Sequence, residues 1–478
     1  MEITLVTEGT YPHSYGGVSV WCDQLLRGMP EKSFHVAAIT GSGSEPVVWD
    51  LPSHVRVTGF PLWGPPPGGP ALTGRAARRF EMLYCELIDD LLGDPDSPAD
   101  TFTDLLRELH ELSWTESVEA ALRSEDAVGW VLDAWQARGE LDEAGIAPTV
   151  HDAVTAVDLL EHALRPLFRP ALDSDVSHAV TNGLAVLVCL SAKWTHGTPF
   201  ILTEHGVYLR ERYLEYGNSP YSWPVKALML GFLRRLCSAG YRNADLITPG
   251  NRYNQRWELR GGADPARLQT VYNGVDPEHF PPAGAEPAAP TISWAGRIDP
   301  IKDVETLVHA FALVRKQIPD ARLRLFGGTP AGNEPYRDRC RDLIVELKLD
   351  GAATLEGRVD NILDAYAAGH VVALSSISEG FPYTLIEAMT AGRATVSTDV
   401  GGVTEAVGDT GLVVPPRDPE AMAAACVQLL RDADLRNKLG AGARTRALEF
   451  FTVEQAVGTF RAIYAELAGV PSARRATR

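Results

Sequence analysis

The chain has 478 residues, of which 45% are hydrophobic and 22% charged, and this length suits two globular domains rather than one core. Its net charge of −18 argues against a nucleic-acid partner, because contacts with phosphates need a basic surface. The sequence contains neither a membrane-spanning apolar run nor a signal peptide, and its six cysteines are scattered. We therefore expect a cytoplasmic protein with reduced thiols.

The negative charge is concentrated in one segment. Residues 81–180 carry 23 Asp and Glu against 5 Arg, so this segment accounts for the whole net charge. Such an excess is more typical of a solvated helical surface than of a face that docks a partner.

The first third of the chain predicts a βαβ start followed by a long helical segment. Residues 2–7 and 35–40 have the pattern of buried strands, and Gly16-Gly17-Val18 between them leads into a helix that runs to about Met29. Residues 61–70 form a Pro- and Gly-rich loop. The acidic segment from about 74 to 170 is too long for a connection and predicts a helical insertion.

Strand-helix alternation then resumes and predicts two doubly wound α/β domains. The strands expected in the remainder of the first domain are residues 185–190, 200–203 and 245–248. Residues 277–290 resemble a linker, and the strands expected after it are 291–295, 322–326, 371–374 and 394–398. We expect the two sheets to face each other, with a cleft between the carboxyl ends of their strands. Ligands of such sheets bind at these strand ends.

These patterns predict four parts of the chain. The first domain covers residues 1–283, with the insertion at about 74–178, and the second domain covers 284–450. A final helix at 451–470 follows, and residues 471–478 form a polar tail that we expect to be disordered.

Two glutamates in the second domain give the strongest functional signal. They delimit the run Glu379-Gly-Phe-Pro-Tyr-Thr-Leu-Ile-Glu387, which follows the expected strand 371–374 and opens a helix. The free N–H groups of a first helical turn favour a phosphate, and a carboxylate accepts hydrogen bonds from vicinal hydroxyls. In isolation the two glutamates could be ordinary helix residues, but their context favours a sugar-nucleotide site.

Two further clusters fit a diphosphate. Arg297 and Lys302 follow the expected strand 291–295, where a bidentate guanidinium and a compact ammonium group suit phosphate oxygens, although solvated surface cations are the alternative. Gly16 and Gly17 would let backbone N–H groups approach a phosphate, although a tight turn is the alternative.

Polar residues at the strand ends of the first domain are candidates for the acceptor side. His205 follows the expected strand 200–203 and would contact a sugar hydroxyl, although a structural role is the alternative. Glu204, His178 and Asn182 are weaker candidates of the same kind. The sequence predicts no metal site, because none of its Asp-x-Asp pairs (94/96, 173/175 and 432/434) follows a sheet strand.

Together these motifs resemble the GT-B glycosyltransferases of family 4. The resemblance rests on the arginine-lysine cluster, the two-glutamate run, His205-Gly206 and Tyr272-Asn-Gly-Val-Asp276. The opening Thr7-Glu-Gly-Thr-Tyr-Pro and the run Ser-Ile-Ser-Glu-Gly-Phe-Pro-Tyr are similar to the PelF branch, which makes an exopolysaccharide. Pro382 stands where the wider family has glycine, and a proline fixes φ and removes a donor.

The resemblance implies roles for individual residues. Glu387 would bind ribose hydroxyls, Glu379 the transferred sugar, and Arg297 and Lys302 the diphosphate. Arg358 would meet uracil and His205 the donor sugar. The residues that the resemblance implies as catalytic are Glu379, His205, Arg297 and Lys302. The remaining residues that the family pattern places at the donor are Gly16, Gly17, Gly380, Phe381, Pro382, Tyr383, Thr384 and Leu385.

The implied activity is retaining, metal-independent transfer of a hexose, with glucose the best guess, from a UDP-sugar to a saccharide or another hydroxyl acceptor. No cofactor is expected, and the oligomeric state is left open. Two alternatives remain. One is a non-catalytic nucleotide-sugar-binding subunit of a polysaccharide synthesis or secretion complex, in which the acidic insertion would dock to a membrane polysaccharide-export complex. The other is a UDP-sugar epimerase.

Overall fold

The computed structural model describes residues 1–64, 69–94, 100–139, 145 and 147–469. The chain divides into two compact units. Unit 1 comprises Met1–Pro249, Gln255–Thr270 and the chain from Phe460 on, and unit 2 comprises Gly250–Asn254 and Val271–Thr459. The predicted disordered tail at 471–478 lies outside the described residues, as does Asp96 of the first Asp-x-Asp pair.

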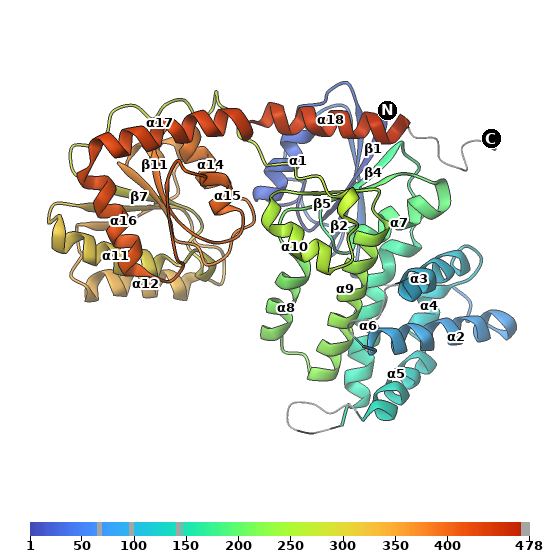
Figure 1. Ribbon diagram of the computed structural model, residues 1–478. Helices are drawn as coiled ribbons and strands as arrows, with labels where there is room; N and C mark the ends of the chain where they lie inside the picture. The colour runs from blue at the N-terminus through green and yellow to red at the C-terminus, as the bar shows by residue number, and fades with distance from the viewer. Residues whose placement is uncertain (65–68, 95–99, 140–144, 146, 470–478) are drawn as a thin grey trace. The chain divides into compact units, whose positions relative to one another are not determined.

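Unit 1 is built on a parallel sheet in the order β3-β2-β1-β4-β5-β6 (Figure 1). Its strands are β1 (Glu2–Glu8), β2 (Ser33–Thr40), β3 (Val55–Pro61), β4 (Val176–Ala179), β5 (Phe200–Glu204) and β6 (Leu246–Pro249). The central strands are buried along almost their whole length, because both faces of a parallel sheet are covered.

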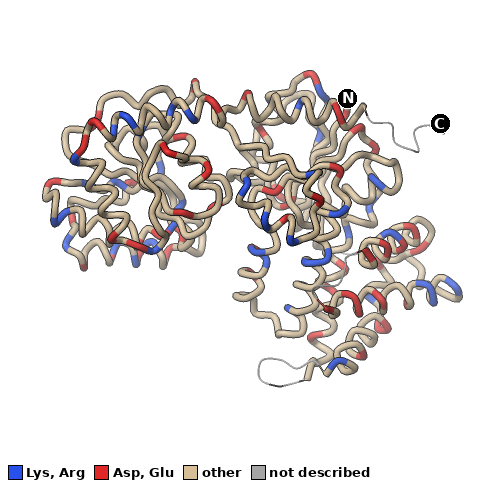
Figure 2. The backbone as a smooth tube through the Cα atoms, viewed as in Figure 1, with Lys and Arg blue, Asp and Glu red and all other residues tan. Residues whose placement is uncertain are grey.

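The helices of unit 1 include a segment inserted between β3 and β4. That segment holds α2 (Gly74–Leu91), α3 (Asp100–Leu112), α4 (Val118–Leu122), α5 (Glu125–Arg138) and α6 (Val150–Phe168). The others are α1 (Gly17–Arg27), α7 (Ala185–His196), α8 (Tyr208–Asn218), α9 (Trp223–Asn243), most of α10 (Arg252–Arg260) and the short η1 (Pro265–Arg267). Figure 2 shows acidic positions spread over the helices of the inserted segment, which fits a solvated surface.

The prediction of a strand at residues 185–190 is wrong. This apolar run lies in α7, and the strand that joins the sheet beside β1 is β4, which ends before this run begins. The run Ala-Val-Leu-Val-Cys-Leu is buried all round, and a fully buried helix has no polar face that would reveal its period. The inserted helices accordingly end at Phe168, and His178 belongs to the sheet.

Unit 2 repeats the architecture with a parallel sheet in the order β12-β11-β10-β7-β8-β9. The strands are β7 (Thr291–Ala295), β8 (Arg322–Phe326), β9 (Ala353–Gly357), β10 (Val371–Leu374), β11 (Ala394–Thr398) and β12 (Leu412–Val414). The helices are η2 (Pro300–Lys302), α11 (Val304–Gln317), α12 (Glu334–Glu346), α13 (Ile362–Ala367), α14 (Tyr383–Thr390), α15 (Val403–Val407), α16 (Pro419–Arg431) and α17 (Ala433–Phe450). The four predicted strands are present, whereas the partly exposed β9 and β12 carry too little apolar pattern to be recognised.

The boundary between the units lies at Thr270/Val271 rather than at 283/284. The chain after Val271 already packs in unit 2, where Val275 pairs with Thr452 and the ring of Tyr272 stacks on Phe381 at 5.3 Å. The Pro- and Ala-rich composition of residues 277–290 indicated a linker but could not show that the preceding residues are anchored.

The last helix, α18 (Val453–Gly469), changes unit at Phe460. Its second half packs on the sheet of unit 1, where Tyr464 contacts Nδ1 of His178 at 2.7 Å and Phe460 contacts the Trp21 ring at 5.3 Å. Arg461 also pairs with Glu31 at 3.0 Å. Among the described helices, none combines the length and apolarity needed to cross a bilayer.

Candidate functional site

Two loops at the carboxyl edge of the unit 2 sheet are joined to each other. One follows β7 and contains η2, and the other follows β10, which is the parallel neighbour of β7. Ser375 donates its hydroxyl to the carbonyl oxygen of Lys302 at 2.8 Å, and the N–H of Ile377 donates to the carbonyl oxygen of Ile301 at 2.9 Å. These bonds bring together two motifs that lie far apart in the sequence.

An ion pair between Lys302 and Glu379 spans the same two loops. The ammonium Nζ of Lys302 lies 2.5 Å from Oε1 of Glu379, and the hydroxyl of Ser376 donates to that oxygen as well. The side chains of the pair are only 17% and 10% exposed. Because little solvent screens such a pair, the electrostatic attraction holds the ammonium group beside the carboxylate.

Glycines allow the neighbouring backbone segments to approach this edge. Gly401 has φ +56°, and a Cβ there would lie 1.8 Å from the carbonyl oxygen of Glu379. Gly327 has φ +142°, and a Cβ there would lie 1.7 Å from the carbonyl oxygen of Gly296. Any other residue would push these loops apart. The sequence analysis did not single out either position.

Glu387 is held by a buried tyrosine. The side chain of Glu387 is half-buried on α14, and the hydroxyl of Tyr366 on α13 donates to its Oε2. Tyr366 is fully buried. Burial raises the pKa of the Glu387 carboxyl, and the hydrogen bond from Tyr366 partly offsets this rise. One carboxylate oxygen is therefore oriented by the protein, which leaves the other for a ligand.

The segment before α14 is well packed. Pro382 is the N-cap residue, so the helix begins at Tyr383, and the N–H of Leu385 donates to the carbonyl oxygen of Pro382 at 3.2 Å. Phe381 is buried between Tyr272 and Phe451. In this structure Phe381 is a core residue and the N–H of Leu385 is engaged, so their contacts with a donor stay predictions, as do those of Gly380 and Thr384.

The two other predicted site cations of unit 2, Arg297 and Arg358, are more exposed than Lys302. Arg297 is 70% exposed and lies 3.3 Å from the Asp299 carboxylate. Arg358 follows β9, is exposed, and lies across Gly328, where a Cβ would come within 3.1 Å of its side chain. Both side chains have the freedom to reorient toward an anion.

In unit 1, the candidate residues Gly16 and Gly17 are exposed, whereas His205 is not. Gly16 is the extended N-cap residue of α1 and Gly17 its first residue, and both are exposed. His205 follows β5, and its ring packs edge-on against Trp21 at 4.8 Å. Burial lowers the pKa of His205 to about 4, so its imidazole is neutral at physiological pH.

The three predicted acceptor-side residues are fully buried. His178 is bonded through both ring nitrogens, to Tyr464 and to Thr203, and burial lowers its pKa to about 3. Asn182 donates to the carbonyl oxygen of Cys237. Glu204 accepts from the N–H of Tyr208 and from the hydroxyl of Tyr241. All three side chains make internal hydrogen bonds in this conformation, and their acceptor role stays a prediction.

A group of buried carboxyls in unit 1 was missed by the sequence analysis. Glu8, at the end of β1, accepts from the hydroxyl of Tyr208 at 2.7 Å and from the N–H of Leu184 at 2.8 Å. Glu258 on α10 is completely buried, and among the described residues neither of its carboxylate oxygens has a hydrogen-bond partner. Burial, together with nearby Glu204, raises the pKa of Glu258 to about 9, and burial raises that of Glu204 to about 7.

This burial predicts a pH-dependent stability. The folded protein keeps the Glu258 proton up to about pH 9, whereas the unfolded chain releases it near the ordinary value of 4.5, so stability falls as pH rises through this window. We expect Glu258→Gln to be more stable than the wild type by about 1–3 kcal/mol at pH 8.5, and equally stable at pH 4.5. Calorimetric unfolding at both pH values measures this. A pH-independent difference, or the same gain from the exposed Glu81→Gln, would contradict it.

One group of three possible metal ligands occurs among the described residues. Asp158, Glu161 and His162 lie on α6, but Arg165 already binds both oxygens of Glu161 at 2.7 and 2.9 Å. Of the Asp-x-Asp pairs named above, Asp432 caps α17 and Asp175 accepts from the N–H of Glu2. These carboxylates therefore have structural partners.

Two family models match the chain. The model described as "Domain of unknown function (DUF3492)" matches residues 1–266, more than half of the chain. The model described as "Glycosyl transferases group 1" matches residues 289–432, which contain the lysine-glutamate pair and Glu387.

Curated proteins similar to this chain include two described as D-inositol 3-phosphate glycosyltransferase. The one from Kineococcus radiotolerans is 34% identical over 215 residues, which are 40% of this chain and 49% of the relative. The one from Stackebrandtia nassauensis is 36% identical over 205 residues, which are 39% of this chain and 46% of the relative. The chain thus spans about half the length of the curated relatives it matches.

Solved structures show similarity over nearly the whole chain. Sucrose-phosphate synthase from Thermosynechococcus elongatus has a TM-score of 0.64 at 19% identity, covering 98% of both chains. HepE from Anabaena in complex with UDP has a TM-score of 0.63 at 15% identity, covering 98% of this chain and 100% of that chain. Together with the two six-stranded parallel sheets, these similarities show the GT-B fold.

Proposed function

The chain belongs to the family described as "Domain of unknown function (DUF3492)", and we propose that it is a glycosyltransferase that transfers a hexose from a UDP-sugar to a hydroxyl acceptor with retention of anomeric configuration. The observation that carries the proposal is the group of Lys302, Glu379 and Glu387 at the carboxyl edge of the unit 2 sheet. Ligands of open α/β sheets bind at this edge. The glycosyltransferase model that matches residues 289–432 supports the same assignment.

The donor would be held by charge and hydroxyl recognition. Glu387, oriented by Tyr366, would accept hydrogen bonds from the two ribose hydroxyls. Lys302 would move from Glu379 toward the diphosphate, and the exposed Arg297 would join it. Glu379 would then be released to bind hydroxyls of the transferred sugar. The complexes of HepE with UDP and UDP-glucose support UDP-glucose as the first donor to test.

The proposed chemistry exchanges one bond at the anomeric carbon. The acceptor oxygen bonds to that carbon on the face that UDP leaves, the bond to the diphosphate oxygen breaks, and the acceptor proton passes to the departing diphosphate. Lys302 and Arg297 would stabilise the charge that develops on UDP, which is the task of a metal ion in other transferases. We propose that no metal is required, because these two cations can stabilise the negative charge on the departing UDP.

We also propose the finer assignments that the motifs indicate, namely the PelF-like branch, a role in exopolysaccharide synthesis and a cytoplasmic location. The first two rest on the run from Ser376 to Tyr383 and on the motif from Thr7 to Pro12, and the location rests on the six unpaired cysteines, so they need their own test. Deletion of the gene is expected to abolish an exopolysaccharide of the native cell, and complementation with Lys302→Ala is expected to fail.

Turnover in the presence of EDTA tests the proposed activity. We expect purified protein to bind UDP and to release UDP from UDP-glucose when a saccharide acceptor is supplied, with EDTA present at saturating concentration. NMR of the product distinguishes an α-linked transferred sugar from an epimerised free sugar. If no UDP-, GDP- or ADP-sugar binds, the proposed function is wrong. Donor binding without turnover on any acceptor would favour a non-catalytic subunit.

A further inference from the structure

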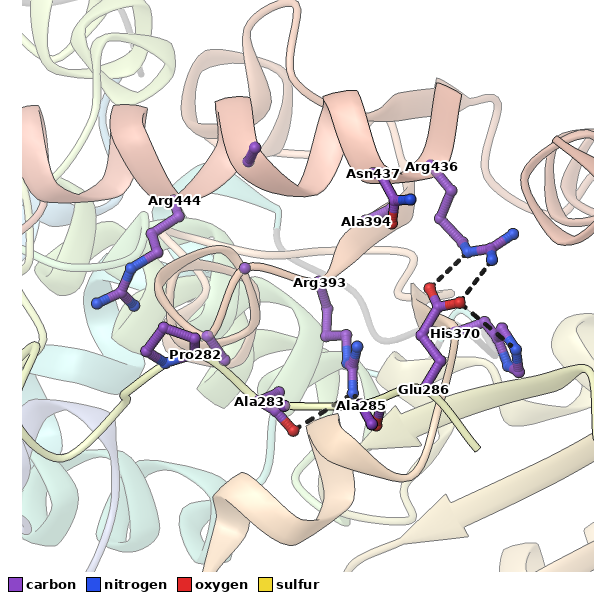
Figure 3. A pocket seen from close by; sticks show the side chains of 14 residues that line it. Pro282, Ala283, Ala285, Glu286, His370, Arg393, Ala394, Arg436, Asn437 and Arg444 are labelled. Atoms are coloured by element: carbon purple, nitrogen blue, oxygen red, sulfur yellow. Dashed lines mark hydrogen bonds and ion pairs between the residues drawn. The ribbon is translucent and has the colours of Figure 1, made fainter. Parts of the chain in front are cut away.

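A second pocket lies at the opposite end of the unit 2 sheet from the candidate donor site. Its volume is about 520 Å³, and its lining includes residues at the N-terminal ends of β10 and β11, where His370 and Ala394 lie. The segment from Pro282 to Glu286 forms one side and α17 the other, as Figure 3 shows. All of these residues belong to unit 2.

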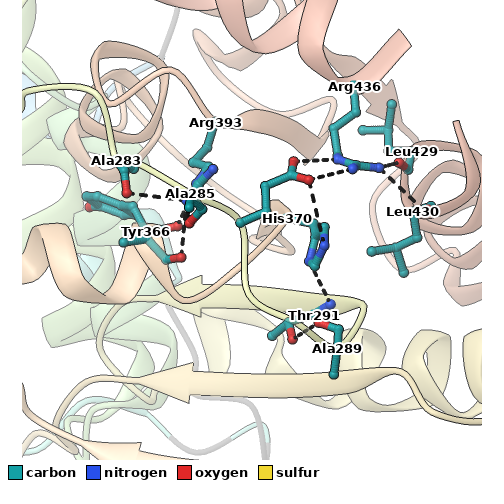
Figure 4. Close-up of polar contacts among 12 residues, drawn as sticks. Ala283, Ala285, Ala289, Thr291, Tyr366, His370, Arg393, Leu429, Leu430 and Arg436 are labelled. Carbon is teal, nitrogen blue, oxygen red and sulfur yellow. Dashed lines mark hydrogen bonds and ion pairs between the residues drawn. The ribbon is translucent and has the colours of Figure 1, made fainter. Parts of the chain in front are cut away.

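Three arginines line this pocket, and two of them are more than nine-tenths buried. Arg436 binds both carboxylate oxygens of Glu286, at 2.7 and 2.6 Å. Arg393 donates from Nη2 and Nε to the backbone carbonyl oxygens of the segment beside it and of α13, among them those of Ala285 and Tyr366 (Figure 4). His370 accepts from the N–H of Thr291 through Nδ1, and burial lowers its pKa.

These contacts hold the segment 282–286 but leave cationic donors in excess. Nη1 of Arg393 has no hydrogen-bond acceptor among the described residues, and neither do Nε and Nη2 of Arg444, which uses Nη1 for the carbonyl oxygens of Phe280 and Thr390. The lining carries three guanidinium groups against the single carboxylate of Glu286. A buried guanidinium without a counter-charge is costly, and a bound anion would offset that cost.

We propose that this pocket is a binding site for a phosphoryl group, either inorganic phosphate or the phosphate of a small sugar phosphate. Guanidinium groups recognise phosphate oxygens through paired N–H donors, and the unused donors of Arg393 and Arg444 supply them. The polar side chain of Asn437 lines the same pocket from α17. The volume lies in the usual range for small-molecule sites, so a sugar phosphate fits as well as the free ion.

Titration calorimetry with inorganic phosphate and with a hexose 6-phosphate tests the site on the full chain, in a buffer free of phosphate and sulfate. We expect at least one of the two to bind. Arg444→Gln is expected to weaken binding about tenfold or more, because it removes a charged donor pair. Asn437→Asp should act in the same direction, since it adds a negative charge to an exposed position at the pocket without removing an internal contact. If the hexose 6-phosphate binds more tightly, the ligand of the pocket is a sugar phosphate. If inorganic phosphate binds equally or more tightly, the ligand is the free ion.

Two control variants separate this pocket from the donor site. Lys438→Gln removes an exposed charge beside Asn437 that does not line the pocket, and Arg297→Gln removes a cation of the candidate donor site. Both are expected to bind phosphate as the wild type does. The proposal is overturned if neither ligand binds, if Asn437→Asp leaves binding unchanged, or if Arg297→Gln abolishes it. None of these outcomes depends on whether the protein transfers a sugar.

Discussion

Replacing Glu387 by alanine is expected to weaken UDP binding by about 100-fold or more, because two charge-assisted hydrogen bonds to ribose would be lost. The substitution also leaves the hydroxyl of the fully buried Tyr366 without its acceptor, which we expect to cost about 1–3 kcal/mol of folding stability. Calorimetric titration of UDP, together with thermal unfolding, separates the two effects. A variant that is folded and binds UDP with wild-type affinity would refute the ribose role of Glu387.

Tyr366→Phe provides the matched test of how Glu387 is positioned. The ring remains and only the hydrogen bond to Oε2 disappears, so the carboxylate keeps its charge but loses its orientation. We expect a several-fold rise in the Kd for UDP and little change in kcat, because Tyr366 would act through Glu387 alone. Glu346→Ala, at the exposed end of α12, should leave UDP affinity unchanged. Equal effects of Tyr366→Phe and Glu346→Ala on the Kd for UDP would show that the hydrogen bond to Glu387 does not contribute to UDP binding.

The place of the candidate donor residues at strand ends could be predicted because they lie in short continuous motifs. Glu379 and Glu387 both follow one strand, and Arg297 and Lys302 follow another, so local patterns place all four at strand ends. The sequence patterns do not predict which strands are neighbours in the sheet. The pairing of Lys302 with Glu379 depends on β7 and β10 being adjacent, and that order is set by packing of the whole sheet.

The buried polar residues were harder to predict from the sequence than the residues at strand ends. Tyr366 and Glu258 carry no sequence signal that distinguishes them from other residues on amphipathic helices, because their roles come from contacts with distant elements. The acceptor-side candidates are fully buried, which the sequence did not indicate, and their role stays a prediction. His178 and Asn182 were selected as polar residues near expected strand ends, yet misplacing the strand at 185–190 concealed that His178 lies inside β4.

Lys302→Ala is expected to lower kcat about 100- to 1000-fold, the largest effect of any single substitution proposed for the transfer reaction. A preorganised cation that stabilises a departing group typically contributes this much to the rate. The loss should fall on kcat more than on the KM for the donor, because the charge on UDP develops in the transition state. Lys316→Ala, on the exposed part of α11, is the matched control and should keep full activity.

The 2.5 Å contact between Lys302 and Glu379 makes a sharper prediction about the pair. If Glu379 holds the ammonium group in place before the donor arrives, the two residues act as one unit, and their effects on kcat are not independent. The double variant Lys302→Ala/Glu379→Ala should then be far less impaired than the product of the single effects predicts. Single-turnover rates for the four proteins of this cycle measure the coupling. Fully multiplicative losses would mean that the ion pair serves the stability of the two loops and that each residue acts on the donor alone.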